Sequence, residues 1–306
     1  MPDPDLNPEL APGLYLVATP IGNLEDITLR ALRVLKSADR IACEDTRQTQ
    51  KLLNHFEITR PTVSLHQHNE RDRSTELIAE LQAGKRIALV SDAGMPSISD
   101  PGSHLTQAAI TAGIPVYPIP GPNAALSALV ASGLPTSEFH FLGFLPEKAG
   151  ARRTRLEELA KSATDTATTL IFYEAPHRIL ETLTDLESVW GPTLRVVVAR
   201  ELTKLHEEFL RGTVQEVKSS LASRERVRGE ITLLVEAVPL TQAQESDTKG
   251  LIARLAELEA SEGLSEKDAL KRLARDLGQG KSDLYRELQR ERAKQQSPGT
   301  RSAKRS

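Results

Sequence analysis

The first half of the chain alternates short apolar runs with segments whose apolar residues recur at helical spacing. Buried strands are predicted at LYLVA (14–18), IAC (41–43), TVSLH (62–66), IALV (87–90) and VYPI (116–119). Two of the intervening helical segments stop at Gly84 and Gly113, and glycine is common just after a helix. Strands that alternate with helices predict right-handed crossovers and a mostly parallel sheet. We therefore expect an α/β lobe over residues 13–135.

From Phe139 the pattern changes. Strands are predicted at FHFLGFLP (139–146), TLIFYE (169–174), LRVVVARELT (194–203) and EITLLVEAV (230–238). The basic segment EKAGARRTR (147–155) is expected to be a loop, and HEEFLRGT (206–213) an irregular connection. Only some of these strands are joined by a helical segment, so we expect a second α/β lobe with a mixed sheet over residues 136–240.

The C-terminal part, residues 245–294, has the pattern of short helices. Ser265 to Asp268 is typical of a capping box at a helix start, and Gly278 is expected to end that helix. Two helices across a turn that contains glycine match a helix-turn-helix outline, which many helical hairpins share. Residues 1–12 and 295–306 have the composition of disordered segments.

Charge is distributed unevenly along the chain. The 306 residues carry a formal net charge of −3, yet residues 267–306 contain 12 Lys and Arg against 5 Asp and Glu. A basic end on an acidic body indicates either a polyanionic partner or a solvated tail. The acidic, proline-rich N-terminus lacks the features of a signal peptide, and no apolar run is long enough to span a bilayer. We expect a cytoplasmic protein.

Every predicted strand of the first lobe ends in a polar loop. These loops are TPIGN (19–23), EDTR (44–47), HQHNE (66–70), SDAGMPSISDPG (91–102) and PGPNAA (120–125). In open α/β sheets ligands bind outside the carboxyl ends of the strands. None of these loops contains a G-K-[ST] pattern or a lysine, so they favour a neutral or zwitterionic ligand with an adenine edge over a triphosphate. A single loop is explained as a tight turn, but five together indicate a binding site.

Eight motifs carry a resemblance to a known family. They are TPIGNLEDITLRAL, CEDTR, LHQHNE, SDAGMPSISDPG, PIPGPNAALSAL, GFLPEK, IFYEAPHR and ARELTK. In order and spacing they resemble the bacterial small-subunit ribosomal RNA methyltransferase I family, of the tetrapyrrole methylase superfamily. The departures are mild, since Met95 stands where threonine is usual and Gln67 where aspartate is usual.

The resemblance implies a fold of two α/β lobes of the tetrapyrrole methylase type, with a small C-terminal helix-turn-helix-like domain. It implies a homodimer that binds S-adenosylmethionine (SAM) and methylates a cytidine 2′-hydroxyl in the decoding region of 16S ribosomal RNA, without a metal. The SAM contacts that it implies are Pro20, Ser91, Asp92, Ala93, Ile98, Asn123, Ala124, Tyr173, Glu174, Arg200, Glu201 and Leu202. Alternatives are a tetrapyrrole or protein methyltransferase, or a SAM-binding and RNA-binding assembly factor without catalysis.

Residues near these loops are candidates for catalysis and RNA binding. A ribose hydroxyl becomes a good nucleophile as its proton leaves, and the candidate proton acceptors are Asp45, Glu44 and His66. The alternative is that Glu44, Asp45 and Arg47 form a local salt-bridge set. His66 and His68 alternate along the chain and point to opposite faces, so no metal site is expected. The candidate RNA contacts are Arg47, His68, Asn69, Lys148, Arg152, Arg153, Lys281 and Arg286.

Overall fold

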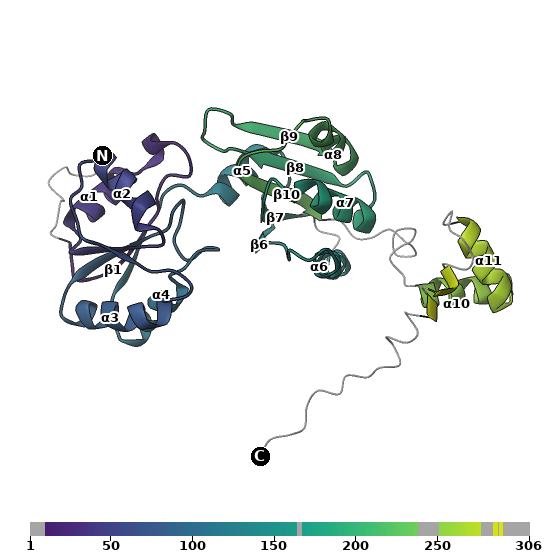
Figure 1. Ribbon diagram of the computed structural model, residues 1–306, viewed down its shortest axis with the longest axis horizontal. Coiled ribbons are helices and arrows are strands. Elements are labelled where there is room, and N and C mark those ends of the chain that lie inside the picture. The colour runs from purple at the N-terminus through teal and green to yellow at the C-terminus, as the bar shows by residue number, and fades with distance from the viewer. Residues whose placement is uncertain (1–9, 164–166, 238–250, 277–283, 287, 290–306) are drawn as a thin grey trace, which may run out of the picture.

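The computed structural model describes residues 10–163, 167–237, 251–276, 284–286 and 288–289 (Figure 1). Its first sheet contains β1 (Gly13–Val17), β2 (Arg40–Cys43), β3 (Thr62–Ser64), β4 (Arg86–Val90) and β5 (Val116–Ile119). The strand order is β3-β2-β4-β1-β5, and all four pairings are parallel. The predicted parallel sheet of the first lobe is confirmed.

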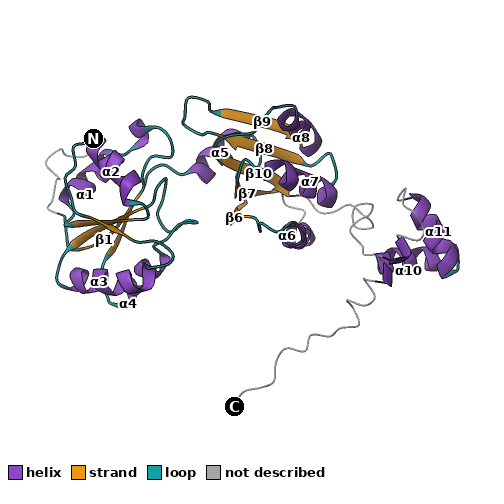
Figure 2. Ribbon diagram, viewed as in Figure 1, coloured by secondary structure: helices purple, strands orange, loops and turns teal. Residues whose placement is uncertain are grey.

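Helices cover both faces of this sheet (Figure 2). On one face, α1 (Leu29–Ser37) and α2 (Thr46–His55) pack in a core that includes Val17, Leu35 and Ile41. On the other face, α3 (Glu70–Gln82) and α4 (Ser103–Thr111) pack in a core that includes Leu77 and Leu89. The strands read as continuous apolar runs because both of their faces are buried.

Helix α5 (Ala124–Ser132) follows β5 in the chain but packs against the second sheet. Its Ala128 and Leu129 lie in a core with Ile171, Val197 and Leu234 of that sheet. The helix is apolar on nearly every side, so its sequence does not indicate which sheet it covers. This packing connects the two lobes through a buried apolar contact.

The second sheet contains β6 (Phe139–Phe144), β7 (Thr168–Glu174), β8 (Arg195–Arg200), β9 (Glu208–Thr213) and β10 (Ile231–Ala237). Its order is β6-β7-β10-β8-β9, with β6 parallel to β7 and the other pairings antiparallel. The predicted mixed sheet is confirmed. The expected irregular connection is wrong, because it contains the edge strand β9. That strand is only half-buried, and its sequence therefore lacks an apolar run.

Helices α6 (Ala149–Lys161), α7 (Ile179–Trp190) and α8 (Val214–Ala222) cover the face of the second sheet opposite α5. The expected basic loop at 147–155 is therefore wrong, since most of it lies in α6. Arg152 is 1% exposed, and its guanidinium donates to Asp185 (2.7 Å) and Glu181 (3.2 Å) of α7. It holds two helices together and is not available to RNA.

The described C-terminal residues form a small helical unit of their own. It contains α10 (Leu251–Glu262) and α11 (Glu266–Asp276), whose apolar residues pack together with Leu284 and Leu288. The predicted cap is present, because the Ser265 hydroxyl accepts from the Asp268 amide (3.3 Å) and donates to its carboxylate (2.6 Å). The predicted helix end at Gly278 and the turn predicted at Gly280 and Lys281 lie outside the described residues. Within the described residues, no helix has the length and apolar character needed to span a bilayer.

The two neighbouring arginines of α6 provide a matched test of this packing. Arg152→Ala leaves Asp185 largely buried without its partner, so we expect it to lower the free energy of unfolding by about 3 kcal/mol. Arg153→Ala removes only a 55% exposed side chain that pairs with Glu157 at 3.7 Å, and its cost is expected to stay below about 0.5 kcal/mol. Denaturant unfolding measures both, and equal costs would contradict the burial of Arg152.

Candidate cofactor and active site

Backbone hydrogen bonds join the loops at the carboxyl edge of the first sheet. The Thr19 amide donates to the Gly94 carbonyl (2.9 Å), and the Gly94 amide donates to the Thr19 carbonyl (3.0 Å). The Asp45 amide donates to the Asp92 carboxylate (3.2 Å). Strands β1, β2 and β4 are neighbours, so their loops meet and are held as one unit.

The 91–102 loop has an unusual backbone. Ser97 and Ser99 have φ angles of 69° and 61°, and Gly102 has φ 122°. A Cβ at Gly102 would lie 2.6 Å from Leu89 Cδ2, so a larger residue does not fit there. Non-glycine residues with positive φ cost free energy and gather at functional sites. The loop therefore needs external support.

Glu70, the first residue of α3, supplies such support. Its carboxylate accepts from the amides of Gly102 and His104, each at 2.9 Å. These amides lie at the start of α4, where helix N–H groups have no partner within the helix. Glu70 therefore anchors the end of the 91–102 loop.

The second lobe contributes the Glu201–Lys204 loop, which follows β8. Glu201 and Thr203 also have positive φ, at 53° and 64°. A Cβ at Gly22 of the first lobe would lie 2.4 Å from Lys204 Cγ and 3.0 Å from the Leu202 carbonyl oxygen. Only glycine permits so close an approach of the two lobes.

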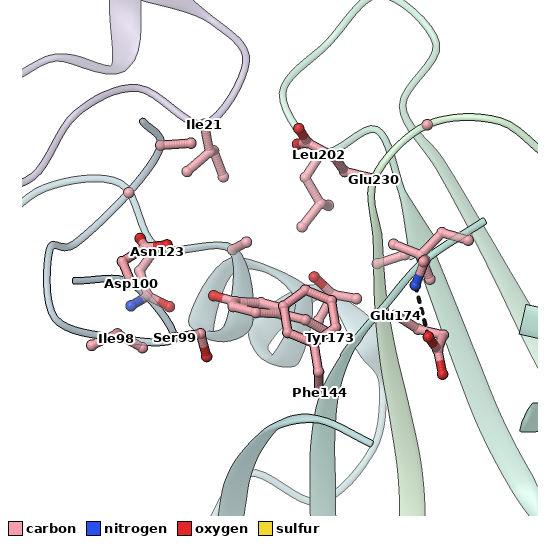
Figure 3. Close-up of a pocket in the computed structure, with 18 of the residues that line it drawn as sticks. Ile21, Ile98, Ser99, Asp100, Asn123, Phe144, Tyr173, Glu174, Leu202 and Glu230 are labelled. Atoms are coloured by element: carbon pink, nitrogen blue, oxygen red, sulfur yellow. Dashed lines mark hydrogen bonds between the residues drawn. The ribbon is translucent and has the colours of Figure 1, made fainter. Parts of the chain in front are cut away.

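A cavity of about 370 Å³ lies between the lobes (Figure 3). Ile21, Asp100 and Asn123 line it from the first-sheet loops and the start of α5, while Tyr173, Leu202 and Thr232 line it from the second lobe. The Tyr173 ring packs edge-on against Phe144 (5.8 Å between centroids). Burial and the nearby Asp100 carboxylate raise the pKa of Tyr173. A largely apolar cavity with a few polar groups is typical of a small-molecule site.

The cavity brings together seven of the twelve predicted SAM contacts. They are Ala93, Ile98, Asn123, Ala124, Tyr173, Glu174 and Leu202. Pro20 and Asp92 instead line a second cavity beside the first. Ser91, Arg200 and Glu201 line neither cavity.

These three residues have other partners. The buried Ser91 hydroxyl donates to the Ala93 carbonyl (3.3 Å) and so shapes the turn. Arg200 pairs with Glu208 (3.0 Å), and Glu201 pairs with Lys204 (2.8 Å). Their side chains order the loops around the cavity.

Glu174 lines the cavity, but its carboxylate is fully occupied. It accepts from Thr182 (2.6 Å), from the Ala175 amide (2.8 Å) and from Arg178 (2.8 Å). Its side chain is completely buried. Glu174 therefore shapes the chain after β7 and does not offer its charge to a ligand.

The three candidate proton acceptors line neither cavity. Asp45 caps α2, and the bound Arg47 side chain lowers the pKa of Asp45 to about 2. Burial raises the pKa of Glu44, and the carboxylates of Asp100, Asp92 and Asp45 raise it further. The His66 ring nitrogen Nδ1 is buried and has no hydrogen-bond partner among the residues that the structure describes.

The predicted RNA contacts differ in availability. Arg47 and His68 are exposed, although Arg47 pairs with Asp45. The Asn69 side chain closes a turn. Its oxygen accepts from the His66 backbone amide (2.8 Å), and its nitrogen donates to the Ser64 carbonyl (3.2 Å). Exposed basic residues also remain at Lys148, Arg153 and Arg286, while Lys281 lies outside the described residues.

Sequence reasoning missed Glu70 as a loop anchor, Gly22 as the lobe contact and Phe144 as a wall of the cavity. All three lie inside motifs that the sequence analysis quoted, but their roles depend on contacts between distant segments. In the described part of the chain, no group of three or more His, Cys, Asp or Glu residues is arranged to hold a metal ion.

Comparison with known proteins defines the class to which this fold and cavity belong. The family model of the tetrapyrrole (corrin/porphyrin) methylases matches residues 13–218. Uroporphyrin-III-C-methyltransferase from Thermus thermophilus has a TM-score of 0.51 at 23% identity over 73% of this chain and 94% of its own. Another structure of that enzyme, with a TM-score of 0.51 at 20% identity, is complexed with S-adenosyl homocysteine and is covered over 96% of its length, against 72% of this chain.

Sequence relatives narrow the class to a family. Ribosomal RNA small subunit methyltransferase I of Halalkalibacterium halodurans is 50% identical over 89% of this chain and 93% of its own length. The protein of the same name from Bacillus subtilis is 46% identical over 89% of this chain and 92% of its own. The chain therefore belongs to the tetrapyrrole methylases and, within them, to the ribosomal RNA small subunit methyltransferase I family. The predicted fold class and family are confirmed.

The Glu70 anchor leads to a prediction about cofactor affinity. Glu70→Ala removes the acceptor of two amides that hold the end of the 91–102 loop, so we expect SAM to bind about tenfold more weakly. Glu70→Gln retains a carbonyl acceptor and is expected to restore most of the affinity. The control is Asp72→Ala, an exposed carboxylate on the same helix. Calorimetric titration with SAM measures all three, and unchanged affinity in Glu70→Ala would contradict the anchoring role.

Proposed function

We propose that this protein transfers a methyl group from SAM to the 2′-hydroxyl of a cytidine in the decoding region of 16S ribosomal RNA. The observation that carries the proposal is the cavity between the lobes, lined by seven predicted SAM contacts. Family membership supports the methyltransferase class and the SAM cofactor. The relatives' names support ribosomal RNA of the small subunit as the substrate.

The residues of the cavity fit SAM. SAM has an adenosine part that suits apolar and aromatic walls, and it has no phosphate. Tyr173, Ile98 and Leu202 provide such walls. The Asn123 side chain accepts from the Leu126 amide (3.0 Å), which fixes the start of α5 beside the cavity. No phosphate-binding pattern is needed for such a ligand.

When bound, SAM supplies a methyl group that is already activated by its sulfonium. Transfer would break the bond from this methyl carbon to sulfur as the bond to the ribose oxygen formed, leaving the electron pair on sulfur and releasing the hydroxyl proton. The protein contributes alignment, because in-line displacement depends strongly on distance and angle. The strained loops at Ser97, Ser99, Glu201 and Thr203 surround the cavity and favour a rigid alignment.

The proton acceptor that we propose is Glu44. Among the three candidates, Asp45 is a weak base because Arg47 holds its pKa at about 2. The pKa of Glu44 is raised by burial and by neighbouring carboxylates, and a base of higher pKa accepts a proton more readily. Glu44 itself lines neither cavity, but one of those neighbours, Asp92, lines the second one.

RNA binding is proposed for two basic regions. Lys148 and Arg153 are exposed at the start of α6. Residues 267–306 have a large excess of basic side chains, and the described helices of this part pack in a core of their own. Phosphate contacts supply most of the affinity for nucleic acid.

We also infer a homodimer that acts in the cytoplasm, where ribosomal RNA is available. Leu126 and Val130 lie four residues apart on α5 and are 47% and 77% exposed. Residues at this spacing share one face of a helix. The exposed apolar face of α5 favours contact with a second copy of the chain.

The substrate is tested by incubating labelled SAM with small ribosomal subunits from cells that lack this enzyme, and then mapping the label. We expect one labelled ribose, at a cytidine of the decoding region. Label in ribosomal protein would indicate a protein methyltransferase. SAM binding without any transfer of label would favour the non-catalytic assembly factor, and either result would contradict the proposal.

The proton acceptor is tested by the dependence of kcat on pH. A base works only when deprotonated, so the rate is expected to fall as the pH drops through the pKa of Glu44, which burial raises above its ordinary value. Glu44→Gln should remove this fall of the rate at low pH and lower kcat on the order of 100-fold. Asp45→Asn keeps a good helix cap and should leave kcat nearly unchanged. A larger loss in Asp45→Asn than in Glu44→Gln would refute the choice.

A further inference from the structure

We propose that the second cavity is the binding site of the acceptor nucleotide, with Lys51 as its phosphate contact. This inference rests on the proposed function and assigns the substrate to a place in the structure. The cavity has a volume of about 540 Å³. It lies among the loop after β1, helix α2 and the Glu201–Lys204 loop.

The two cavities are neighbours. Ile21, Ala93 and Glu230 line both of them. For methyl transfer the ribose oxygen must approach the methyl carbon to about 3–3.5 Å. The acceptor must therefore sit in a space that adjoins the cofactor cavity, and the second cavity meets this requirement.

The lining of the second cavity suits a nucleotide. Its polar side chains come from Thr19, Gln48, Lys51, Asp92, Lys204 and Glu230. The ribose and the base edge of a nucleotide both need hydrogen-bond donors and acceptors, which these side chains provide. The first cavity has more apolar and aromatic walls, among them Tyr173, Phe144 and Leu202.

The charges in this cavity leave one lysine available. Lys204 is neutralised by Glu201 (2.8 Å) and Glu230 (3.1 Å). The Lys51 ammonium donates to the Gln48 side-chain oxygen (2.9 Å), and the structure gives it no carboxylate partner among the described residues. Lys51 is exposed at the cavity. A phosphate beside the target ribose would provide the missing negative charge.

The size of the cavity indicates how the substrate enters. Its volume lies within the range of about 300–1,000 Å³ that is usual for sites that hold one small ligand. It therefore has room for a single nucleotide. We infer that the target is unstacked from its neighbours and inserted alone, as in other enzymes that modify single nucleotides.

Blocking the cavity gives the first test. Gln48→Trp places a large ring at its wall, and we expect methylation of small subunits to fall at least tenfold while SAM affinity, measured by calorimetry, stays unchanged. The control is Gln50→Trp on the same helix, where Gln50 is exposed and bonded to Asn54. That variant is expected to methylate normally.

The salt dependence of RNA binding gives the second test. Lys51→Ala should weaken binding of the subunit RNA on the order of fivefold to tenfold, and should reduce the slope of log K against log salt by about 0.7. A purely structural role would not change that slope. The control is Lys36→Ala, an exposed lysine in the last turn of α1, just before β2 at the opposite edge of the sheet.

The outcomes separate this inference from the proposed function. If the unaltered protein and both variants methylate the RNA equally well, and the slope is unchanged, the acceptor site is wrong while the function stands. If the unaltered protein does not methylate small-subunit RNA, both proposals fail. Loss of SAM binding in Gln48→Trp would also contradict the assignment, because it would place the cofactor in this cavity.

Discussion

The paired backbone hydrogen bonds between Thr19 and Gly94 connect the first and fourth loops, and the geometry of the site depends on them. Strands β1 and β4 are adjacent and parallel, so their carboxyl ends reach the same edge of the sheet. The pair continues the contact of the strands beyond the sheet itself. Ile21 on one side and Ala93 on the other then line both cavities. A small change in this contact would alter both spaces together.

The loops at this edge contain residues with strained backbone angles, and contacts from other parts of the molecule hold them in place. Ser97 and Ser99 have positive φ in the first lobe, as do Glu201 and Thr203 in the second. Such residues are kept in place by surrounding contacts. Glu70 holds the first loop through two amides, and the Gly22 backbone packs against the second. The two strained loops beside the cavity are therefore each held by a contact from another part of the first lobe.

Electrostatics divide the carboxylates of the site into two groups. Glu174 and Asp45 are held by arginines and serve structure. Burial raises the pKa values of Glu44 and Asp100, and nearby carboxylates raise both further, although a hydrogen bond with Ser91 partly offsets the rise at Asp100. The same residue type thus has different chemistry within one site, because the partners differ.

The sequence by itself determined the two sheets, the loops that form the site and the family. Apolar runs and the order of motifs are local properties, so they can be recognised directly in segments such as LYLVA, IALV and SDAGMPSISDPG. The edge strand β9 and the helical course of 147–155 were not, because polar surface positions hide the underlying period. Only the tertiary structure decided that Arg152 is buried, that α5 covers the second sheet and that Pro20 and Asp92 face the second cavity. Those features depend on which distant segments meet, and no local pattern encodes that.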